Sequence, residues 1–287
     1  MSENRLQPQR YLGLELAGAK NPKTTLAVIE YYPKENKVFL LDIHDRIGGT
    51  EEEGADKALI GHIKDLVRNH PKNTVSLAVN VPLELPPCIP CTKKICPFPD
   101  KCTVPAVKWM RDTVKRASKS GSANLPRIKE FTPYTQRPIE LWIRYHVLPD
   151  LPEKLKFDID ETLGGNKAPL TARMQFLKRH LGDTRTFEVW PKLTIACLNA
   201  KLKLSQRILT SYRRLEEGAF ARGEILEAFS KTLGLFIYER DARKLASNLS
   251  SFDAFICAYT ALLADNGKCA LPPKGFPTAS GWVHYPE

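Results

Sequence analysis

Three short hydrophobic runs, separated by polar turns, open the chain. Apolar residues dominate 11–17, 24–31 and 37–43, and the connectors between them contain Lys, Asn, Pro and Glu. Runs of this length bounded by turn residues predict β-strands. Connectors this short predict an antiparallel meander, because a parallel connection needs about a dozen residues or more.

A helical period follows the third strand. Apolar residues recur at helical spacing from Leu59 to Val67, which predicts a helix over residues 54–69. A fourth strand is expected over 74–81, where the chain reaches Pro82. Three meandering strands, a helix and a fourth strand form the opening of the ribonuclease H-like fold. We therefore expect an α/β protein with a mixed sheet and flanking helices.

Proline and cysteine interrupt this pattern over residues 84–104. Beyond them we expect helices over 105–119, 139–147 and 170–181, a fifth strand over 186–190 and a final helix over 249–264. The pattern predicts one domain, residues 1–287. Its parts are a core of strands and first helix (10–83), a four-cysteine loop with a basic helical insertion (84–169), and a fifth strand with C-terminal helices (170–287).

Polar residues lie near the C-terminal ends of three apolar strands: Glu15, Asn80 and Glu188. A charged residue within an apolar strand is costly unless it has a partner or a metal. Small neighbours at Gly13 and Ala17 indicate open space beside Glu15. Asp253 lies in the first turn of the final, almost wholly apolar helix. Converging carboxylates are what two-metal phosphoryl chemistry needs, with Mg²⁺ or Mn²⁺ as the metal.

Each of these residues also has a purely structural interpretation. Glu15 would pair with a buried Arg or Lys, and Glu188 would be a solvated residue at a strand end. Ser250 and Asp253 have the spacing of a capping box, and acidic residues favour helix N-termini.

Several short segments, taken in order, resemble one protein family. They are Gly13–Gly18, Ala78–Leu83, Phe131–Arg137 with Glu140 after it, Phe187–Pro191, Ser250–Ala254 and Gly281–Pro286. Over most of its length the chain is similar to domain of unknown function 429, a family described as predicted ribonuclease H-like nucleases. The resemblance implies that fold and a nuclease activity. The family usually has Asp where this chain has Glu15 and Asn80, and often Asp where it has Ser250.

Four cysteines fall within fifteen residues: Cys88, Cys91, Cys96 and Cys102. Four thiolates in a proline-stiffened loop can surround one tetrahedral Zn²⁺, and an iron–sulfur cluster takes the same ligand number. Four protein ligands leave no open position, so this metal would be structural. Two disulfides or free thiols are the alternatives.

A basic helix is expected directly after these cysteines. Lys108, Arg111, Lys115, Arg116 and Lys119 follow one helical face. Such a face would hold a phosphate backbone, or would simply be solvated.

The loop that follows the basic helix adds Arg127, Tyr134 and Arg137. Arginine binds phosphate bidentately and tyrosine stacks on bases. Glu140 would orient Arg137 or serve as a further acid of the site.

Charge strengthens the expectation of a polyanionic partner. The 287 residues carry 43 Lys and Arg against 32 Asp and Glu, a formal net charge of +11. Clustered cations attract phosphates and release their counterions, although a basic surface also serves solubility alone. No apolar stretch reaches the length of a membrane helix, and the first ten residues lack a signal-peptide core. We expect a cytoplasmic protein that binds nucleic acid, and the sequence indicates no protein partner.

Three functions remain open from the sequence. The first is a metal-dependent nuclease or phosphodiesterase, in which Glu15, Glu188 and Asp253 bind the metal and Asn80 is a neutral ligand. The second is a catalytically inactive nucleic-acid-binding protein on the same scaffold. The third is a nucleotide phosphohydrolase, in which the turn at residues 18–21 contacts phosphate.

Overall fold

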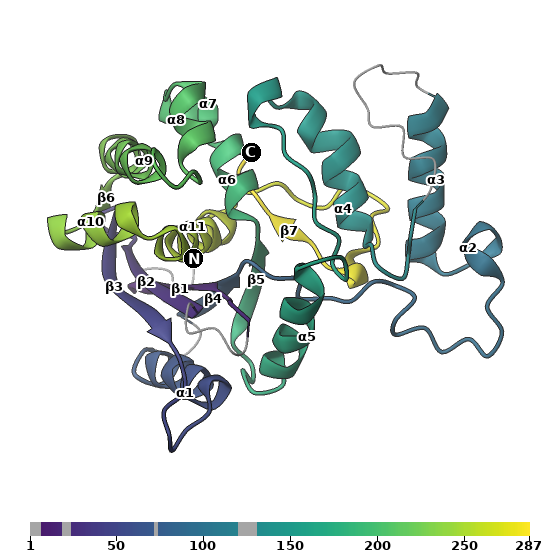
Figure 1. Cartoon of the computed structure of the whole chain (residues 1–287), viewed down its shortest axis with the longest axis horizontal. Coiled ribbons are helices and arrows are strands. Elements are labelled where there is room, and N and C mark those ends of the chain that lie inside the picture. The colour runs from purple at the N-terminus through teal and green to yellow at the C-terminus, as the bar shows by residue number, and fades with distance from the viewer. Residues whose placement is uncertain (1–6, 19–23, 72–73, 120–130) are drawn as a thin grey trace. The chain divides into compact units, whose positions relative to one another are not determined.

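A computed structural model describes residues 7–18, 24–71, 74–119 and 131–287 of the chain (Figure 1). The chain forms two compact units. The first, here called the sheet unit, contains Met1–Val81, Phe176–Ala270 and His284–Glu287. The second, the insertion unit, contains Pro82–Gln175 and Leu271–Val283. The insertion expected over 84–169 lies within the second unit.

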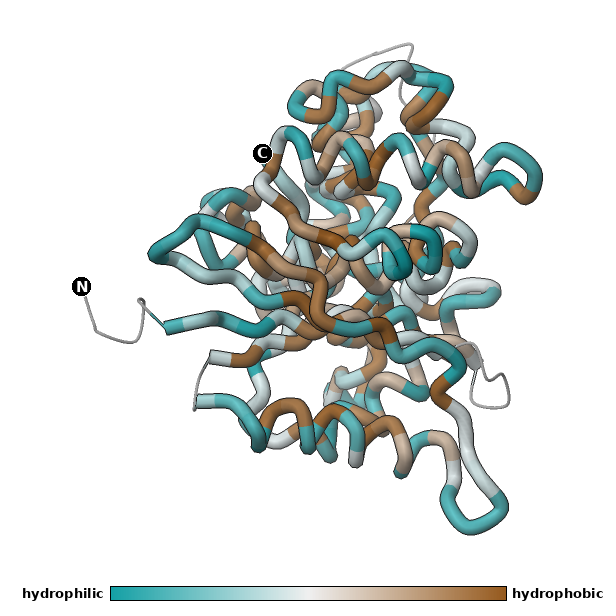
Figure 2. Tube along the Cα trace, turned by 90° about the vertical axis from the view of Figure 1, so that its left-hand side faces the viewer, coloured by the Kyte–Doolittle hydropathy of each residue, from teal (hydrophilic) through white to brown (hydrophobic). Residues whose placement is uncertain are grey.

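A seven-stranded mixed sheet is the main feature of the described chain, with the order β6-β3-β2-β1-β4-β5-β7. Its strands are β1 (Gln9–Glu15), β2 (Thr24–Tyr32), β3 (Lys37–Ile47), β4 (Val75–Val79), β5 (Arg185–Val189), β6 (Leu235–Phe236) and β7 (Val283–His284). The first three form the expected antiparallel meander. β4 runs parallel to β1, β5 parallel to β4, and β6 parallel to β3. Figure 2 shows hydrophobic positions along these strands and hydrophilic ones at the turns.

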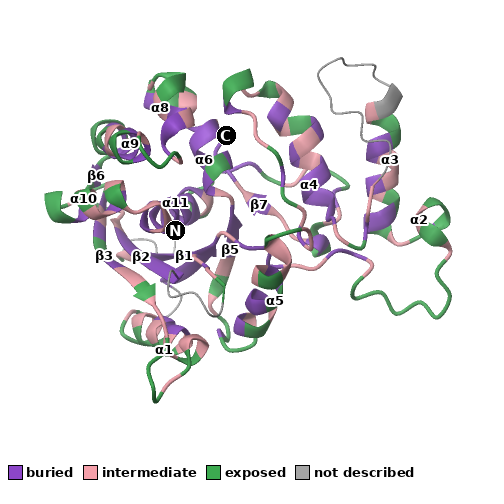
Figure 3. Cartoon of the chain, in the orientation of Figure 1, coloured by how far each residue is buried: buried purple, intermediate pink, exposed green. Residues whose placement is uncertain are grey.

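Helices flank the sheet, as expected. Those of the sheet unit are α1 (Ala55–Arg68), α6 (Pro191–Cys197), α7 (Asn199–Leu202), α8 (Gln206–Ser211), α9 (Gly218–Leu233), α10 (Glu239–Ser247) and α11 (Leu249–Asp265). α11 is buried over most of its length, whereas α1 buries only Leu59 and Ile63 (Figure 3). The almost wholly apolar composition of α11 therefore matches its central position.

The two faces of the sheet follow from the strand register, because residues paired across strands point to the same side. Leu14 pairs with Val79, and Val79 pairs with Glu188, so these three share a face. Gly13 pairs with Ala78 and lies on the opposite face, against α11.

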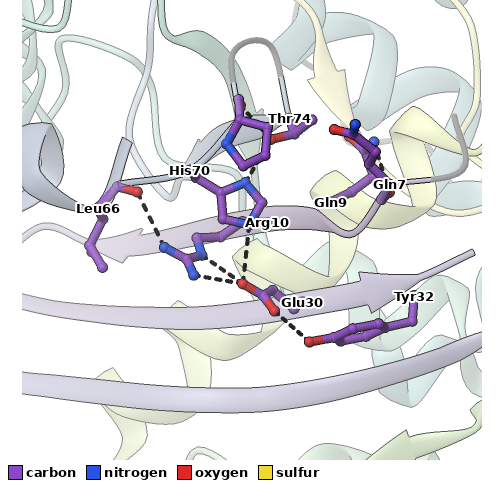
Figure 4. A network of polar contacts seen from close by, with 9 residues as sticks. Gln7, Gln9, Arg10, Glu30, Tyr32, Leu66, His70 and Thr74 are labelled. Atoms are coloured by element: carbon purple, nitrogen blue, oxygen red, sulfur yellow. Dashed lines mark hydrogen bonds and ion pairs between the residues drawn. The ribbon is translucent and has the colours of Figure 1, made fainter. Parts of the chain in front are cut away.

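A network of polar contacts lies on the Leu14 face of the sheet, near the start of β1 (Figure 4). Arg10 donates through Nε and Nη2 to Glu30 Oε1 at 3.0 and 2.6 Å, and through Nη1 to the Leu66 carbonyl of α1. Tyr32 donates to the other Glu30 oxygen at 2.9 Å, and His70 lies 3.2 Å from Oε1. The network joins β1 and β2 to the end of α1.

The insertion unit is built from short helices. They are α2 (Phe98–Lys101), α3 (Pro105–Lys119), α4 (Pro138–Trp142), a π-helical turn (Ile143–Val147) and 3₁₀ turns at Leu148–Asp150, Glu153–Leu155 and Thr278–Ser280. α5 (Lys167–Lys178) follows in the chain. Met110 and Val114 of α3 pack against Leu141 and Tyr145. The bounds of α3 match the sequence prediction because its apolar face is regular and Pro105 starts it.

Candidate functional site

Asn80 and Glu15 lie side by side on the α11 face of the sheet. The Asn80 backbone N–H donates to the Leu14 carbonyl at 3.2 Å, which continues the ladder between β4 and β1. Its side-chain Nδ2 donates to Glu15 Oε2 at 2.8 Å. The amide therefore acts as a neutral donor toward the carboxylate, a role that an Asp at this position would not fill.

Asp253 is held by Arg213. Nη1 of Arg213 lies 2.9 and 2.6 Å from the two carboxylate oxygens, and Asp253 is only 1% exposed. Burial opposes the charge on Arg213, but the Asp253 carboxylate and the Tyr212 hydroxyl together outweigh burial and raise the pKa of the guanidinium above its ordinary value. The arginine supplies a cation at the position where a metal was expected.

Tyr212 connects the two acidic positions. Burial raises its pKa, and the carboxylates of Asp253 and Glu15 raise it further. The Arg213 guanidinium lies 5.5 Å from the centre of the Tyr212 ring. Glu15, Asp253 and Arg213 therefore share one neighbourhood on the α11 face.

Glu188 lies on the other face of the sheet. The register pairs it with Val79, whereas Glu15 and Asn80 alternate to the α11 side. Glu188 is 1% exposed, and Trp190 Nε1 donates to its Oε1 at 3.3 Å. The structure thus brings Glu15, Asn80 and Asp253 together and separates Glu188 from them.

Open space was expected beside Glu15 because Gly13 and Ala17 are small, but at Gly13 the backbone of α11 fills this space. A Cβ atom at Gly13 would lie 1.9 Å from the Ala254 carbonyl oxygen and 2.5 Å from the Ala258 nitrogen. The capping interpretation also changes, because Asn248 caps α11 by accepting from Ser250 N and Ser251 N at 2.9 and 3.3 Å. Asp253 is therefore not needed as a cap.

The arrangement of the acidic residues does not fit a two-metal site. Each acid receives a donor from the chain itself: Asn80 for Glu15, Arg213 for Asp253 and Trp190 for Glu188. Within the described ranges, no group of three or more His, Cys, Asp or Glu side chains is placed to hold a metal ion.

The four cysteines of the insertion unit are free thiols with different environments. Cys91 and Cys96 are exposed, Cys88 is partly buried and Cys102 is buried. Burial raises the pKa of Cys88, and the nearby thiols of Cys102, Cys91 and Cys96 raise it further. Cys88 is thus within electrostatic range of the other three thiols, but these four described side chains are not placed as a group that could hold a metal ion.

Arg111 fastens this loop to α3. Its Nη1 donates to the carbonyls of Pro99, Asp100 and Cys102, at 2.9, 2.8 and 3.1 Å. Lys108 and Lys115 are exposed on the same helix, with Arg116. The predicted basic face therefore contains three exposed cations and one arginine, Arg111, whose donors are bound to the cysteine loop. The side chain of Lys119 lies outside the described part of the chain.

Arg137 and Glu140 form a buried pair. Arg137 is fully buried, its Nε lies 3.2 Å from Glu140 Oε1, and the same Nε donates to Thr162 at 2.6 Å. Glu140 also accepts the Arg137 backbone N–H at 3.1 Å. Of the two roles considered for Glu140, orienting Arg137 matches this geometry. Tyr134 is 54% exposed.

Other predicted contacts cannot be placed. Arg127 and residues 19–21 of the proposed phosphate turn lie outside the described residues.

Sequence reasoning missed Arg213. It lies in the irregular segment between α8 and α9, where no hydrophobic period places it. The only available signal was the run Tyr212–Arg213–Arg214, an aromatic residue followed by two cations.

One family model covers residues 21–277, with the description "Protein of unknown function (DUF429)". The chain belongs to this family. The DUF429 match includes Asn80, Arg213 and Asp253 and begins after Glu15. No curated protein and no solved structure matches the chain. In the part of the chain that the structure describes, every helix is too short or too polar to cross a membrane.

Proposed function

We propose that the sheet unit has the ribonuclease H-like fold. The strand order β3-β2-β1-β4-β5 supports this, with three antiparallel strands followed by two parallel ones. The position of α11 over β1, with Asp253 in its first turns, agrees with the same topology.

We propose further that this DUF429 protein binds nucleic acid without cleaving it. The Arg213–Asp253 pair carries the proposal, since a metal would have to displace a guanidinium from a buried carboxylate. Removing a charged partner from a buried pair is costly. The neutral Asn80 beside Glu15 adds to the argument, because it lowers the negative charge available to a divalent cation.

Exposed cations support the choice of nucleic acid as the partner. Lys108, Lys115 and Arg116 are exposed on α3, and the chain has a formal net charge of +11. Lysine and arginine side chains that contact phosphates release condensed counterions, which gives sequence-independent affinity. Tyr134 adds an exposed aromatic ring for stacking on a base.

The test is fluorescence anisotropy with labelled single- and double-stranded oligonucleotides at several salt concentrations, in buffer without added divalent metal. We expect binding without added divalent metal that weakens as salt rises. Lys108→Gln with Lys115→Gln should weaken binding and lower the salt slope by about two. The matched control, Lys57→Gln with Lys231→Gln, removes two exposed lysines of the sheet unit and should change neither. Absence of binding at low salt would refute the proposal.

A metal-dependent nuclease is the second candidate function. The observation in its favour is that the carboxylates of Asp253 and, more weakly, Glu15 both act electrostatically on Tyr212. Incubating the same oligonucleotides with Mg²⁺ or Mn²⁺ decides between the two. Cleavage that disappears in Asp253→Asn would establish the nuclease, and intact substrate supports the binding protein.

The four-cysteine loop is proposed to hold a structural Zn²⁺, with an iron–sulfur cluster as the alternative. The electrostatic influence of the other three thiols on Cys88 supports this, and metal binding would draw the four into a tetrahedral set. Elemental analysis of the purified protein should find about one zinc per chain, or several irons for the alternative cluster, and Cys91→Ser and Cys96→Ser should lose this metal. Cys197→Ser, on α6, is the control and should keep it. A metal-free wild-type protein would refute this assignment.

A further inference from the structure

A cavity of about 650 Å³ opens in the sheet unit next to the Arg213–Asp253 pair. Its walls come from the end of β3, the segment between α8 and α9, the end of α10 and the first turn of α11. The lining contains five cationic side chains: Arg46, Arg213, Arg214, Arg222 and Lys244. Asp45 is the acidic residue among the lining residues.

Three of the five cations are bound to a buried carboxylate, to a lining carboxylate or to backbone carbonyls. Arg213 holds Asp253, and Lys244 lies 3.0 Å from Asp45 while it donates to the Ile43 carbonyl at 2.7 Å. Arg222 is 5% exposed and donates to backbone carbonyls, including that of Ala246 at 2.7 Å. Arg213 and Lys244 are thus neutralised by carboxylates, whereas Arg222 keeps its positive charge but has its donors bound to carbonyls. The other two cations are the ones with donors to offer a ligand.

The two remaining cations of the cavity are Arg46 and Arg214. The Arg214 side chain is 66% exposed, and its pair with Glu217, at 3.6 Å, is at the surface and contributes little. Arg46 is exposed and makes no ion pair with any residue in the described ranges. Two arginines with open guanidinium groups at one cavity match the bidentate geometry of phosphate oxygens.

The backbone places Arg46 at this cavity through a β-bulge. Thr24 pairs with Ile47 and Leu26 with His44, so Thr25 alone faces both Asp45 and Arg46. Arg46 has φ of 57°, a left-handed conformation that is unfavourable for a residue with a side chain. Bulges redirect side chains, and all three residues of this one line the cavity.

The first turn of α11 adds a favourable field. Asn248, Leu249 and Ser250 line the cavity, so the positive end of the dipole of a 17-residue helix faces it. The N–H groups of Ser250 and Ser251 are already bound by Asn248. The helix therefore contributes its dipole, and the arginines supply the donors.

We propose that this cavity binds a terminal phosphate group, with Arg46 and Arg214 as its ligands. Its volume lies within the range of small-molecule sites, which leaves room for a nucleoside behind the phosphate. The identity of the ligand as a nucleic-acid end rests on the function proposed above. The chemistry of the pocket also fits a mononucleotide or inorganic phosphate, and the experiment separates these sources.

The experiment compares two short oligonucleotides labelled at the 3′ end, one with a 5′-phosphate and one with a 5′-hydroxyl, by anisotropy in buffer without added divalent metal. Wild type should bind the phosphorylated strand about tenfold more tightly, because charge-assisted hydrogen bonds are the strong ones. Arg46→Gln and Arg214→Gln should abolish this preference, and Arg214→Lys should keep part of it. Arg68→Gln, at an exposed arginine of α1, is the control and should keep all of it. Competition with a mononucleotide and with inorganic phosphate identifies the smallest ligand.

The outcomes separate this proposal from the proposed function. Equal affinity for both strands, unchanged in the Gln variants, overturns the phosphate pocket while nucleic-acid binding stands. If no strand binds but inorganic phosphate raises the melting temperature of wild type and not of Arg214→Gln, the pocket stands and nucleic-acid binding falls. If neither phosphate nor any strand binds, the pocket proposal is overturned as well.

Discussion

Gly13 shows how a single position sets the distance between the sheet and its central helix. The space that a side chain would need is occupied by the backbone of α11, at Ala254 and Ala258. Backbone atoms cannot rotate away as a flexible side chain can, so α11 can approach β1 this closely only because residue 13 has no Cβ atom.

Gly13→Ala should therefore lower the free energy of unfolding by about 3 kcal/mol, since the helix must shift to avoid overlap. Gly61→Ala in α1 is the matched control, because nothing lies within 4 Å of the added methyl. It should raise stability by about 0.5 kcal/mol. Urea unfolding measures both, and equal effects of the two substitutions would contradict the packing described here.

Arg213 and Asp253 form the pair on which the functional argument rests. Arg213→Gln leaves a buried carboxylate without its cation and should destabilise the protein by about 2 kcal/mol. Adding Asp253→Asn should recover most of this loss, because the uncompensated charge is then gone. A double-mutant cycle by urea unfolding measures the coupling, and additive effects would show that the two groups do not interact.

The sequence pattern predicted which residue types occur at the site better than it predicted which of these residues lie close together. Asn80, Glu15 and Asp253 do converge on one face. Glu188 does not, because its face depends on the register between β4 and β5, which is set by pairing and not by its own strand. The sequence pattern did not predict the contact of Arg213 with Asp253, because Arg213 lies in an irregular segment forty residues earlier in the chain.

At the scale of elements, the network around Glu30 makes the β1–β2–α1 junction sensitive to acid. Burial alone would raise the pKa of Glu30, but hydrogen bonds from Arg10 and Tyr32 bring it below its ordinary value of 4.5. Burial, and then Arg10, lower the pKa of His70 below 6.5.

Both shifts predict a loss of stability as pH falls. The unfolded chain protonates its histidine first, so the His70 contribution decreases from pH 6.5 down to its lower folded pKa. The Glu30 contribution is complete above pH 4.5 and disappears as pH falls through its lowered folded pKa. Glu30→Gln should lower the free energy of unfolding by about 2 kcal/mol at neutral pH, and should weaken the loss of stability at acidic pH. Urea unfolding across this pH range provides the measurement. An unchanged loss of stability at acidic pH in the variant would contradict the account.

Arg111 is an element-level connection between α3 and the cysteine loop. Arg111→Ala removes the donor to three carbonyls, so residues 99–102 should exchange amide hydrogens faster and be cleaved more readily by proteases. Arg116→Ala, on the same helix, is the control and should leave the loop unchanged. A loss of nucleic-acid affinity in Arg111→Ala with unchanged exchange would return it to a phosphate-binding role.

Long periodic elements were predictable, and short ones were not. The expected helix over 54–69 is observed as Ala55–Arg68 and the final helix over 249–264 as Leu249–Asp265. The two-residue strands β6 and β7 carry no period and were missed. Their formation depends on neighbouring strands and not on local sequence.

On the scale of the whole molecule, the chain combines a mixed α/β sheet unit with a cysteine-containing insertion unit. Hydrophobic periodicity and the DUF429 resemblance were enough to predict the α/β sheet with flanking helices. The arginine-lined cavity depends on a bulge, a loop and a helix end brought together by folding. Each of these has an ordinary local sequence, so the cavity was not predictable from the chain alone.

The central claim is that Arg213, and not a metal ion, is the partner of Asp253. The most direct measurement is anomalous scattering from crystals of the protein grown with Mn²⁺ and a 5′-phosphorylated oligonucleotide. We expect Arg213 to remain on Asp253, with no Mn²⁺ peak between Asp253 and Glu15. An Mn²⁺ ion bound to Asp253, with Arg213 displaced, would contradict the claim and make this protein a nuclease candidate.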